Sequence, residues 1–242
     1  MAGAAGGFSE EHFREAYAEL QQLVGAGAGW QLLVETMNIS VYGRRDKRTG
    51  LYEYKVFGVL EDCPPDVLVA VYMDLDYRKQ WDEYIEELYE QEYNGQTVIY
   101  CKVKYPFPMS KRDYVYIQQL QELDTTRGKI YMVVSQSTSV PQLPEKRGVI
   151  RVKQYKQSLA IERDGNGGSK GKAWGTCWHT SQAPLQNAVL TDGGAIGCMK
   201  LLRGGGGAEN GDRCKTDQRS TTGERLDPPL QTWLQPEVDV EI

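Results

Sequence analysis

The chain has 242 residues and a net charge of -5, with 40% hydrophobic and 25% charged residues. This balance is typical of a soluble globular protein and excludes a strong overall positive field, so we expect no nucleic-acid partner. Five cysteines without regular spacing argue against a disulfide framework, and no stretch approaches the roughly 20 apolar residues of a transmembrane helix. We therefore expect a cytoplasmic protein.

The first third of the chain predicts a helix, a three-stranded meander and two shorter helices. Ser9 suits an N-cap, and apolar residues recur at helical spacing after it to about Val24. Pro64 and Pro65 suit the first turn of a later helix. The predicted elements are helices over 9–24, 64–72 and 74–81, and strands over 30–35, 39–45 and 51–60.

Five further strands are predicted up to residue 162. Asn94-Gly95 separates two alternating segments, which is among the strongest short-range signals for a hairpin. The predicted strands cover 85–93, 97–104, 113–123, 129–139 and 148–162. This order of elements predicts an α+β domain with one large, curved antiparallel sheet.

The composition changes after residue 162. Fourteen of the 26 glycines lie between Gly165 and Gly223, and apolar periodicity largely disappears. Glycine-rich segments without apolar periodicity behave as flexible linkers. We therefore expect this part of the chain to be poorly ordered.

Two apparent motifs fail in detail. Segment 164–172 resembles a phosphate-binding loop, but Asn166 and Ala173 stand where that motif needs glycine and serine or threonine. A hairpin turn or linker is the favoured interpretation. Cys177 and His179, with two later cysteines, lack the closely spaced ligand pairs of a structural zinc site, so we expect no metal and no cofactor. Two histidines in the whole chain do not favour a hydrolytic triad, and we expect no enzyme.

Arg78 lies among aromatic and apolar residues. Asp82 follows it at i+4, so one interpretation is a surface helix pair that contributes little to stability. The other interpretation starts from Tyr72, Tyr77 and Trp81, which indicate that one face of this segment is buried. A buried guanidinium needs an anion, and it can hold a phosphate through two parallel hydrogen bonds.

Tyr114, Tyr116 and Tyr155 are candidates for a complementary cation site. Aromatic ring faces attract a quaternary ammonium group, which cannot form hydrogen bonds. An anion site beside a cation site matches a zwitterionic head group. Strand tyrosines are also common as ordinary core or surface residues, so this pattern alone leaves both interpretations open.

Six runs of sequence around these residues are specific. They are WQLLVET at 30–36, TGLYEYKVFGVLEDC at 49–63, DYRKQWD at 76–82, VKYPFPMS at 103–110, RDYVY at 112–116 and GVIRVKQYKQSLAIE at 148–162. At unchanged spacing over about residues 8–170, they resemble the START (steroidogenic-acute-regulatory-related lipid transfer) domain family. The resemblance implies a helix-grip fold, in which a curved antiparallel sheet and helices enclose a tunnel for one lipid. It also implies non-enzymatic transfer of phosphatidylcholine by a monomer that contacts membrane surfaces transiently.

The resemblance assigns a role to seven residues. They are Arg78, Tyr72 and Gln157 for the lipid phosphate, Asp82 as the ion-pair partner of Arg78, and Tyr114, Tyr155 and Val103 for choline. One position departs from the family pattern, because Cys101 stands where the resemblance predicts tryptophan. Tryptophan offers the best cation-π surface, so the exchange would cost on the order of 1 to 2 kcal/mol of head-group affinity.

A larger departure follows Lys170. The family continues with a final strand and a long amphipathic helix that covers the tunnel, and residues 171–242 resemble neither. We therefore expect a START-like domain over 1–170 that lacks its last strand and lid helix, and a disordered tail over 171–242, as a splice variant would produce. One alternative is a lidless, transfer-deficient isoform that acts as an interaction module. A more remote one is an enzyme that uses Asp82 as a base.

Overall fold

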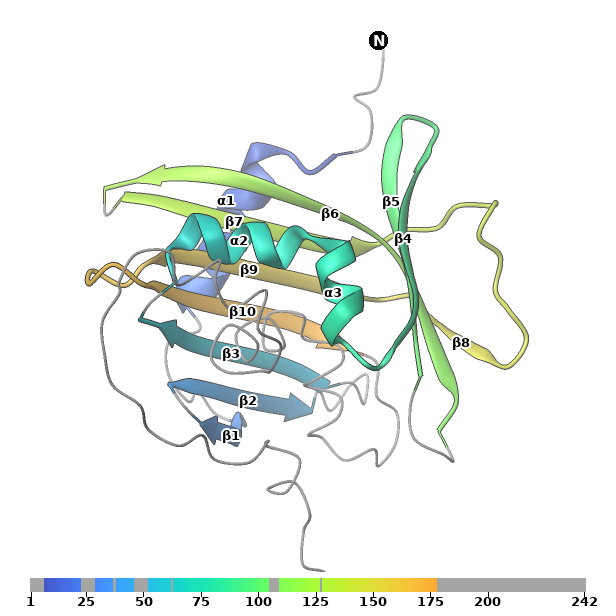
Figure 1. Ribbon diagram of the computed structural model, residues 1–242, viewed down its shortest axis with the longest axis horizontal. Helices are drawn as coiled ribbons and strands as arrows, with labels where there is room; N and C mark the ends of the chain where they lie inside the picture. The colour runs from blue at the N-terminus through green and yellow to red at the C-terminus, as the bar shows by residue number, and fades with distance from the viewer. Residues whose placement is uncertain are drawn as a thin grey trace, which may run out of the picture.

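The computed structural model describes residues 7–22, 29–36, 38–45, 52–61, 63–104, 109–126 and 128–177. Three helices and ten strands lie in these ranges (Figure 1). The helices are α1 (Glu10–Gln22), α2 (Pro65–Met73) and α3 (Leu75–Trp81). The strands are β1 (Gln31–Thr36), β2 (Ile39–Arg45), β3 (Tyr52–Leu60), β4 (Ile85–Tyr93), β5 (Gln96–Val103), β6 (Lys111–Thr125), β7 (Gly128–Ser137), β8 (Val149–Val152), β9 (Lys156–Arg163) and β10 (Ser169–Cys177).

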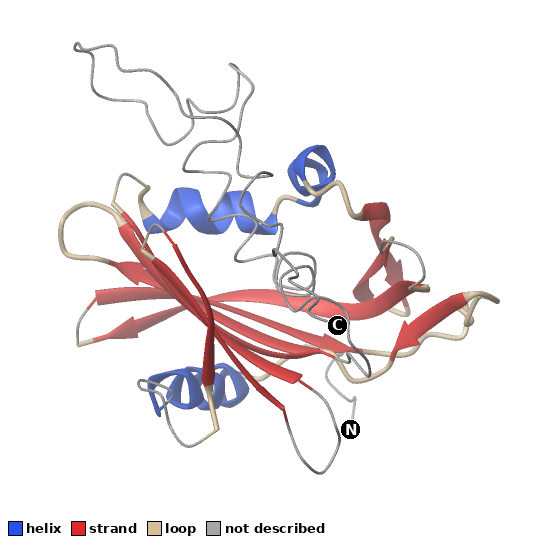
Figure 2. Ribbon diagram, turned by 90° about the horizontal axis from the view of Figure 1, so that it is seen from below, coloured by secondary structure: helices blue, strands red, loops and turns tan. Residues whose placement is uncertain are grey.

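All ten strands belong to one curved sheet. Its order is β1-β2-β3-β10-β9-β7-β6-β5-β4, with antiparallel pairing throughout, and β8 pairs with β6 in parallel. Helices α2 and α3 lie on one face of the sheet and α1 lies on the other (Figure 2). The expected α+β class and the curved antiparallel sheet are therefore confirmed.

The central strands are buried on both faces because helices cover each side. Side chains alternate between the two faces of a strand, so neighbouring residues of β7 and β9 enter different cores. On the α2 face, Leu68, Val69 and Val71 pack with Val133, Leu159 and Ile161. On the α1 face, Phe13, Ala16 and Leu20 pack with Met132, Val134 and Ala160.

The predicted hairpins are present, including the turn at Asn94-Gly95, where both residues have positive φ (53° and 77°). One predicted strand, 148–162, is divided into β8 and β9. The division occurs where the chain changes partner from β6 to β7. There the backbone N–H of Tyr155 donates to Ser137 Oγ (2.6 Å), and the N–H of Ser137 donates to the Tyr155 carbonyl (2.8 Å). Both segments have strand-like composition, so the sequence pattern does not reveal the change of partner.

Strand β10 is a correction to the sequence-based expectation. We expected the last strand to be missing and the domain to end at residue 170, but residues 171–177 complete a strand that pairs with β3 on one side and β9 on the other. Two glycines and two lysines give β10 as a whole little intrinsic strand preference, and pairing on both edges overrides it. The expected disorder of 178–242 and the expected loss of a lid helix lie outside the described residues.

The glycine-rich segment before β10 forms a hairpin turn, as favoured from the sequence. Asp164 Oδ1 accepts hydrogen bonds from the backbone N–H groups of Asn166 (2.7 Å) and Gly168 (2.9 Å). The N–H of Asp164 donates to the carbonyl of Gly168 (3.1 Å). The turn connects β9 directly to β10 and therefore brings the end of the described chain into the middle of the sheet.

Candidate functional site

Arg78 and Asp82 are placed by the short helix α3. Asp74 caps its N-terminus, because its carboxylate accepts a hydrogen bond from the N–H of Tyr77 at 2.8 Å. Asp82 ends the helix, and its N–H donates to the carbonyl of Arg78 at 3.0 Å. Residues four apart lie on the same side of a helix, so the two side chains meet.

The two side chains form a buried ion pair. Nε and Nη2 of Arg78 both donate to Oδ2 of Asp82, each at 3.3 Å. Only 17% of the Arg78 side chain and 2% of the Asp82 side chain are exposed. The interpretation as a surface helix pair is therefore wrong, and removing one partner would leave the other as a buried charge.

The environment of Arg78 keeps its guanidinium charged. Burial acts to lower the pKa of Arg78, but its neighbours outweigh burial and raise the pKa above its ordinary value. These neighbours are Cys101, Tyr116, Asp82 and Tyr155. The positive charge therefore lies between strand tyrosines and the carboxylate of α3.

Three tyrosines form an aromatic cluster beside Arg78. Tyr114 and Tyr116 alternate along β6 and point to the same face, and Cys101 on β5 opposes Tyr114. The ring of Tyr155 meets both tyrosine rings edge-on, with centroid distances of 5.6 Å and 5.3 Å. Val103, which is 1% exposed, packs in the same cluster.

Gln157 and Tyr72 join this cluster from two other elements. The hydroxyl of Tyr155 donates to Oε1 of Gln157, which leaves the amide Nε2 as the donor end of that side chain. Tyr72 on α2 is half-buried and lies near Tyr116. The pKa of Tyr116 is raised by burial first and by Cys101 and Tyr72 next, while Arg78 acts to lower it.

The structure thus brings together the seven residues singled out from the sequence. The family resemblance assigns no role to Tyr116, although its spacing of two from Tyr114 indicates that both side chains lie on the same face of the strand. No metal-binding group of three or more His, Cys, Asp or Glu side chains occurs in the described ranges. Nor does any helix there have the length and apolar character needed to cross a membrane.

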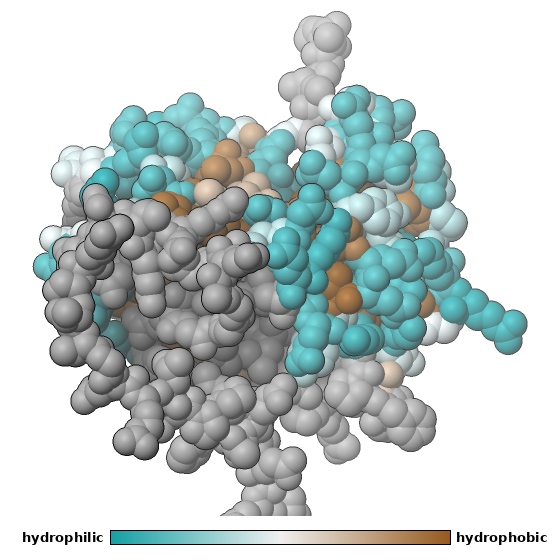
Figure 3. Space-filling view, viewed as in Figure 1, coloured by the Kyte–Doolittle hydropathy of each residue, from teal (hydrophilic) through white to brown (hydrophobic). Residues whose placement is uncertain are grey.

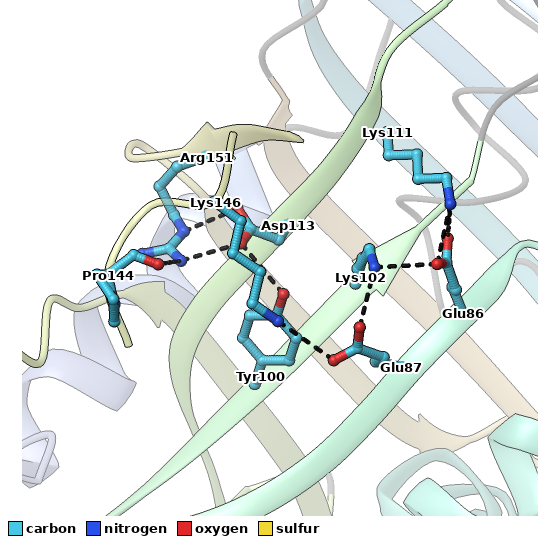
Figure 4. A network of polar contacts seen from close by, with 9 residues as sticks. All are labelled: Glu86, Glu87, Tyr100, Lys102, Lys111, Asp113, Pro144, Lys146 and Arg151. Carbon is cyan, nitrogen blue, oxygen red and sulfur yellow. Dashed lines mark hydrogen bonds and ion pairs between the residues drawn. The ribbon is translucent and has the colours of Figure 1, made fainter. Parts of the chain in front are cut away.

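A second polar network lies on the opposite face of β6 (Figure 4). Asp113 is 0% exposed, and it accepts two hydrogen bonds from Arg151, from Nε at 2.8 Å and from Nη2 at 2.9 Å. The same arginine donates to the carbonyls of Leu143 (3.0 Å) and Pro144 (3.3 Å). Tyr100 donates its hydroxyl to Asp113 at 3.2 Å. Arg151 therefore ties β8 and the preceding loop to β6, directly behind Tyr114.

Lysines extend this network toward the sheet edge (Figure 4). Lys102 on β5 contacts both Glu86 and Glu87 on β4 at 2.9 Å, and Lys146 reaches Glu87 at 3.4 Å. These contacts raise the pKa of Lys102, since the hydrogen bonds that it donates to Glu87 and Glu86 favour its charged form. The network therefore connects β4, β5 and the loop before β8 at the end of the sheet that carries Cys101 and Val103.

The surface on the α2 and α3 side mixes polar and apolar side chains, and Figure 3 shows apolar patches among polar residues over these helices. Leu120 is 40% exposed, although its strand position places it on the same face as Tyr116. This face of β6 therefore carries an exposed apolar residue beyond the aromatic cluster, with Gln118 between them.

A family model for the START domain matches residues 10–179. The chain belongs to the START domain family. It is 68% identical over 167 residues to human phosphatidylcholine transfer protein, covering 69% of this chain and 78% of the relative. It is 65% identical over 170 residues to the bovine phosphatidylcholine transfer protein, covering 70% and 80%.

Solved START domains have the same fold. The crystal structure of human STARD10 superposes with a TM-score of 0.62 at 18% identity, covering 82% of this chain and 84% of that chain. Human StAR-related lipid transfer protein 5 superposes with a TM-score of 0.58 at 14% identity, covering 80% and 97%. The START match extends past Cys177, so β10 belongs to the matched domain.

Proposed function

We propose that this START domain binds one phosphatidylcholine molecule and carries it between membranes, as a monomer that touches membrane surfaces transiently. The observation that supports this proposal is the buried guanidinium of Arg78 beside the tyrosine cluster. An anion site next to an aromatic cation site matches the phosphate and the choline of one zwitterionic head group. The names of the human and bovine relatives support the same lipid.

In this proposal each element of the site has a separate task. Arg78 binds the phosphate, with the Nε2 donors of Gln157 and the hydroxyl of Tyr72 as further hydrogen-bond donors. Choline lies against the rings of Tyr114 and Tyr155. The acyl chains follow the apolar face between the sheet and α2. No bond is made or broken, because extraction and delivery require only binding and release.

Asp82 acts as a counter-ion rather than as the base of a reaction. It accepts both hydrogen bonds from Arg78 and lies at the C-terminal end of α3. The carboxylate therefore fixes the direction of the guanidinium before lipid arrives, which lowers the entropic cost of binding. This role accounts for its burial without any catalytic step.

Native mass spectrometry of the full chain tests the phosphate site. The wild-type chain should retain one phosphatidylcholine, and Arg78→Ala should reduce retention about 10- to 100-fold, since a charge-assisted hydrogen bond contributes about 1.5–3 kcal/mol. Lys79→Ala is the matched control, because this neighbouring cation is exposed and pairs with Asp76 at the surface. Full retention by Arg78→Ala would refute the assignment.

Arg78→Ala also leaves Asp82 buried without its partner, which destabilises the fold. The double variant Arg78→Met, Asp82→Asn removes both charges and should restore the melting temperature but not the lipid. Loss of fold and loss of lipid are thereby separated.

Transfer is tested separately from retention. A chain that carries phosphatidylcholine should move a fluorescent analogue from donor to acceptor vesicles, and Arg78→Ala should not. The alternative of a lidless, transfer-deficient isoform predicts retention without transfer, and it concerns residues outside the described ranges. Rapid transfer by the full chain would eliminate that alternative.

A further inference from the structure

Three neighbouring strands show a similar change in chemistry along the face of the sheet that α2 covers. On β6 the residues on this face are Tyr116, Gln118 and Leu120, on β7 they are Ser137, Ser135 and Val133, and along the chain into β9 they are Tyr155, Gln157 and Leu159. The series on β6 and β9 begin with a tyrosine of the aromatic cluster, and the series on β7 begins with Ser137 beside them. Each series then continues with a polar residue and ends with an apolar one. Gln118 opposes Ser135, and Ser135 opposes Gln157, so these three side chains form one polar row across the strands.

Two of the three side chains in the polar row are buried, and the row is rich in hydrogen-bond donors. Ser135 is 1% exposed and Gln157 is 6% exposed. The amide of Gln118 donates to Ser135 Oγ at 3.1 Å, and Oε1 of Gln157 accepts from Tyr155. Within the described ranges, neither the hydroxyl proton of Ser135 nor the Nε2 group of Gln157 has an acceptor. A ligand that presents acceptors here would pair with these donors.

The position of the row restricts which part of a ligand reaches it. Residues two apart on a strand are separated by about 7 Å along it, so the row lies about 7 Å from Tyr116 on one side and about 7 Å from Leu120 on the other. A phospholipid whose head group lies at Arg78 and whose acyl chains lie on the apolar wall must place its glycerol backbone between them. In a diacyl phospholipid, that region carries ester carbonyl oxygens, which accept hydrogen bonds and have no donors.

We infer that the polar row recognises the acyl ester linkage, with the Ser135 hydroxyl donating to an ester carbonyl oxygen and Gln118 holding that hydroxyl in place. The inference rests on the proposed function and adds a specificity that the head-group site does not provide. The domain therefore distinguishes diacyl phosphatidylcholine from the dialkyl ether form, which has the same head group and chain lengths but no carbonyl oxygens. Choline and phosphate make the same contacts with both lipids.

A competition experiment with the full chain tests this specificity. Vesicles containing equal amounts of diacyl and dialkyl phosphatidylcholine of identical chain length are offered to the protein, and native mass spectrometry gives the ratio of the two lipids bound. One neutral hydrogen bond changes an equilibrium by about 2- to 10-fold, so the wild-type chain should prefer the diacyl form by that factor. Ser135→Ala should lower the ratio to about 1 while head-group selection is retained.

Ser158→Ala is the matched control. Ser158 is also a serine of the central sheet with 1% exposure, but it lies one residue from Gln157 and therefore faces α1. This variant should keep the wild-type ratio. An unchanged ratio in Ser135→Ala, or equal binding of both lipids by the wild-type chain, would overturn the inference while leaving the proposed function intact. Binding of neither lipid would refute the proposed function and the inference together.

Discussion

Replacing Asp113 with asparagine tests whether the ion pair behind the tyrosine cluster stabilises the domain. The Asp113 side chain is 1% exposed and that of Arg151 is 10% exposed. Removing one member of a buried ion pair typically costs about 3–5 kcal/mol, and the slight exposure of Arg151 places this variant near the lower limit, at about 3 kcal/mol. For a domain of this size, that loss corresponds to a decrease in melting temperature of about 6–12 °C.

Thermal and urea unfolding of Asp113→Asn, Arg151→Met and the double variant measure this effect. The double variant should be more stable than the sum of the single losses predicts, because no uncompensated buried charge remains. Glu145→Gln is a matched control, since Glu145 lies in the loop before β8 that Arg151 contacts but forms its ion pair with Lys153 at the surface. The side chains of Glu145 and Lys153 are 58% and 69% exposed. Its loss should stay below about 0.5 kcal/mol. Strictly additive single losses, or equal losses for Asp113→Asn and Glu145→Gln, would show that the pair is not a stabilising unit.

Two further predictions concern the choline site and the last strand. Cys101→Trp should increase affinity for choline head groups about 5- to 30-fold, because it adds a cation-π surface. The effect is measured as the bound ratio of phosphatidylcholine to phosphatidylethanolamine. Cys101→Ala should leave that ratio unchanged. An equal effect of both variants would contradict this reasoning. Gly168→Ala should destabilise the domain severely, because its Cβ would lie 2.2 Å from the carbonyl oxygen of Leu60. Gly165→Ala should cost only about 1–2 kcal/mol, since its Cβ has no atom of the described residues within 4 Å and the positive φ opposes the change. Similar chemical denaturation midpoints for the two glycine variants would refute the close approach of β3 at the start of β10.

Local signals in the sequence predicted much of this fold. The Asn94-Gly95 turn requires positive φ at two successive positions, and this requirement identifies a hairpin from two residues. The alternation of apolar and polar residues placed most strands within a few positions, because one face of each strand must be buried. Arg78 was identifiable since an arginine among aromatic residues indicates a buried charge that needs an anion.

Features that depend on distant partners were not predictable in the same way. Residues 171–177 have a weak strand pattern, and only pairing with β3 and β9 makes them a strand. The parallel pairing of β8 with β6 depends equally on tertiary contacts. The local sequence around Ser135 does not distinguish it from other strand residues. Its place in the polar row emerges only when three strands are aligned in register.

The position of β10 has a consequence for how the chain is synthesised. The strand made last among those described lies between β3 and β9, so until it emerges the growing sheet has two halves, each with an unpaired interior edge. Unpaired edges recruit other chains, and pairing between segments far apart in sequence is slow. The segment that follows residue 170 is therefore constrained by its backbone as well as by its side chains. Residues 171–177 must bond to both unpaired edges, and a chain that stops earlier should aggregate before it can bind any ligand.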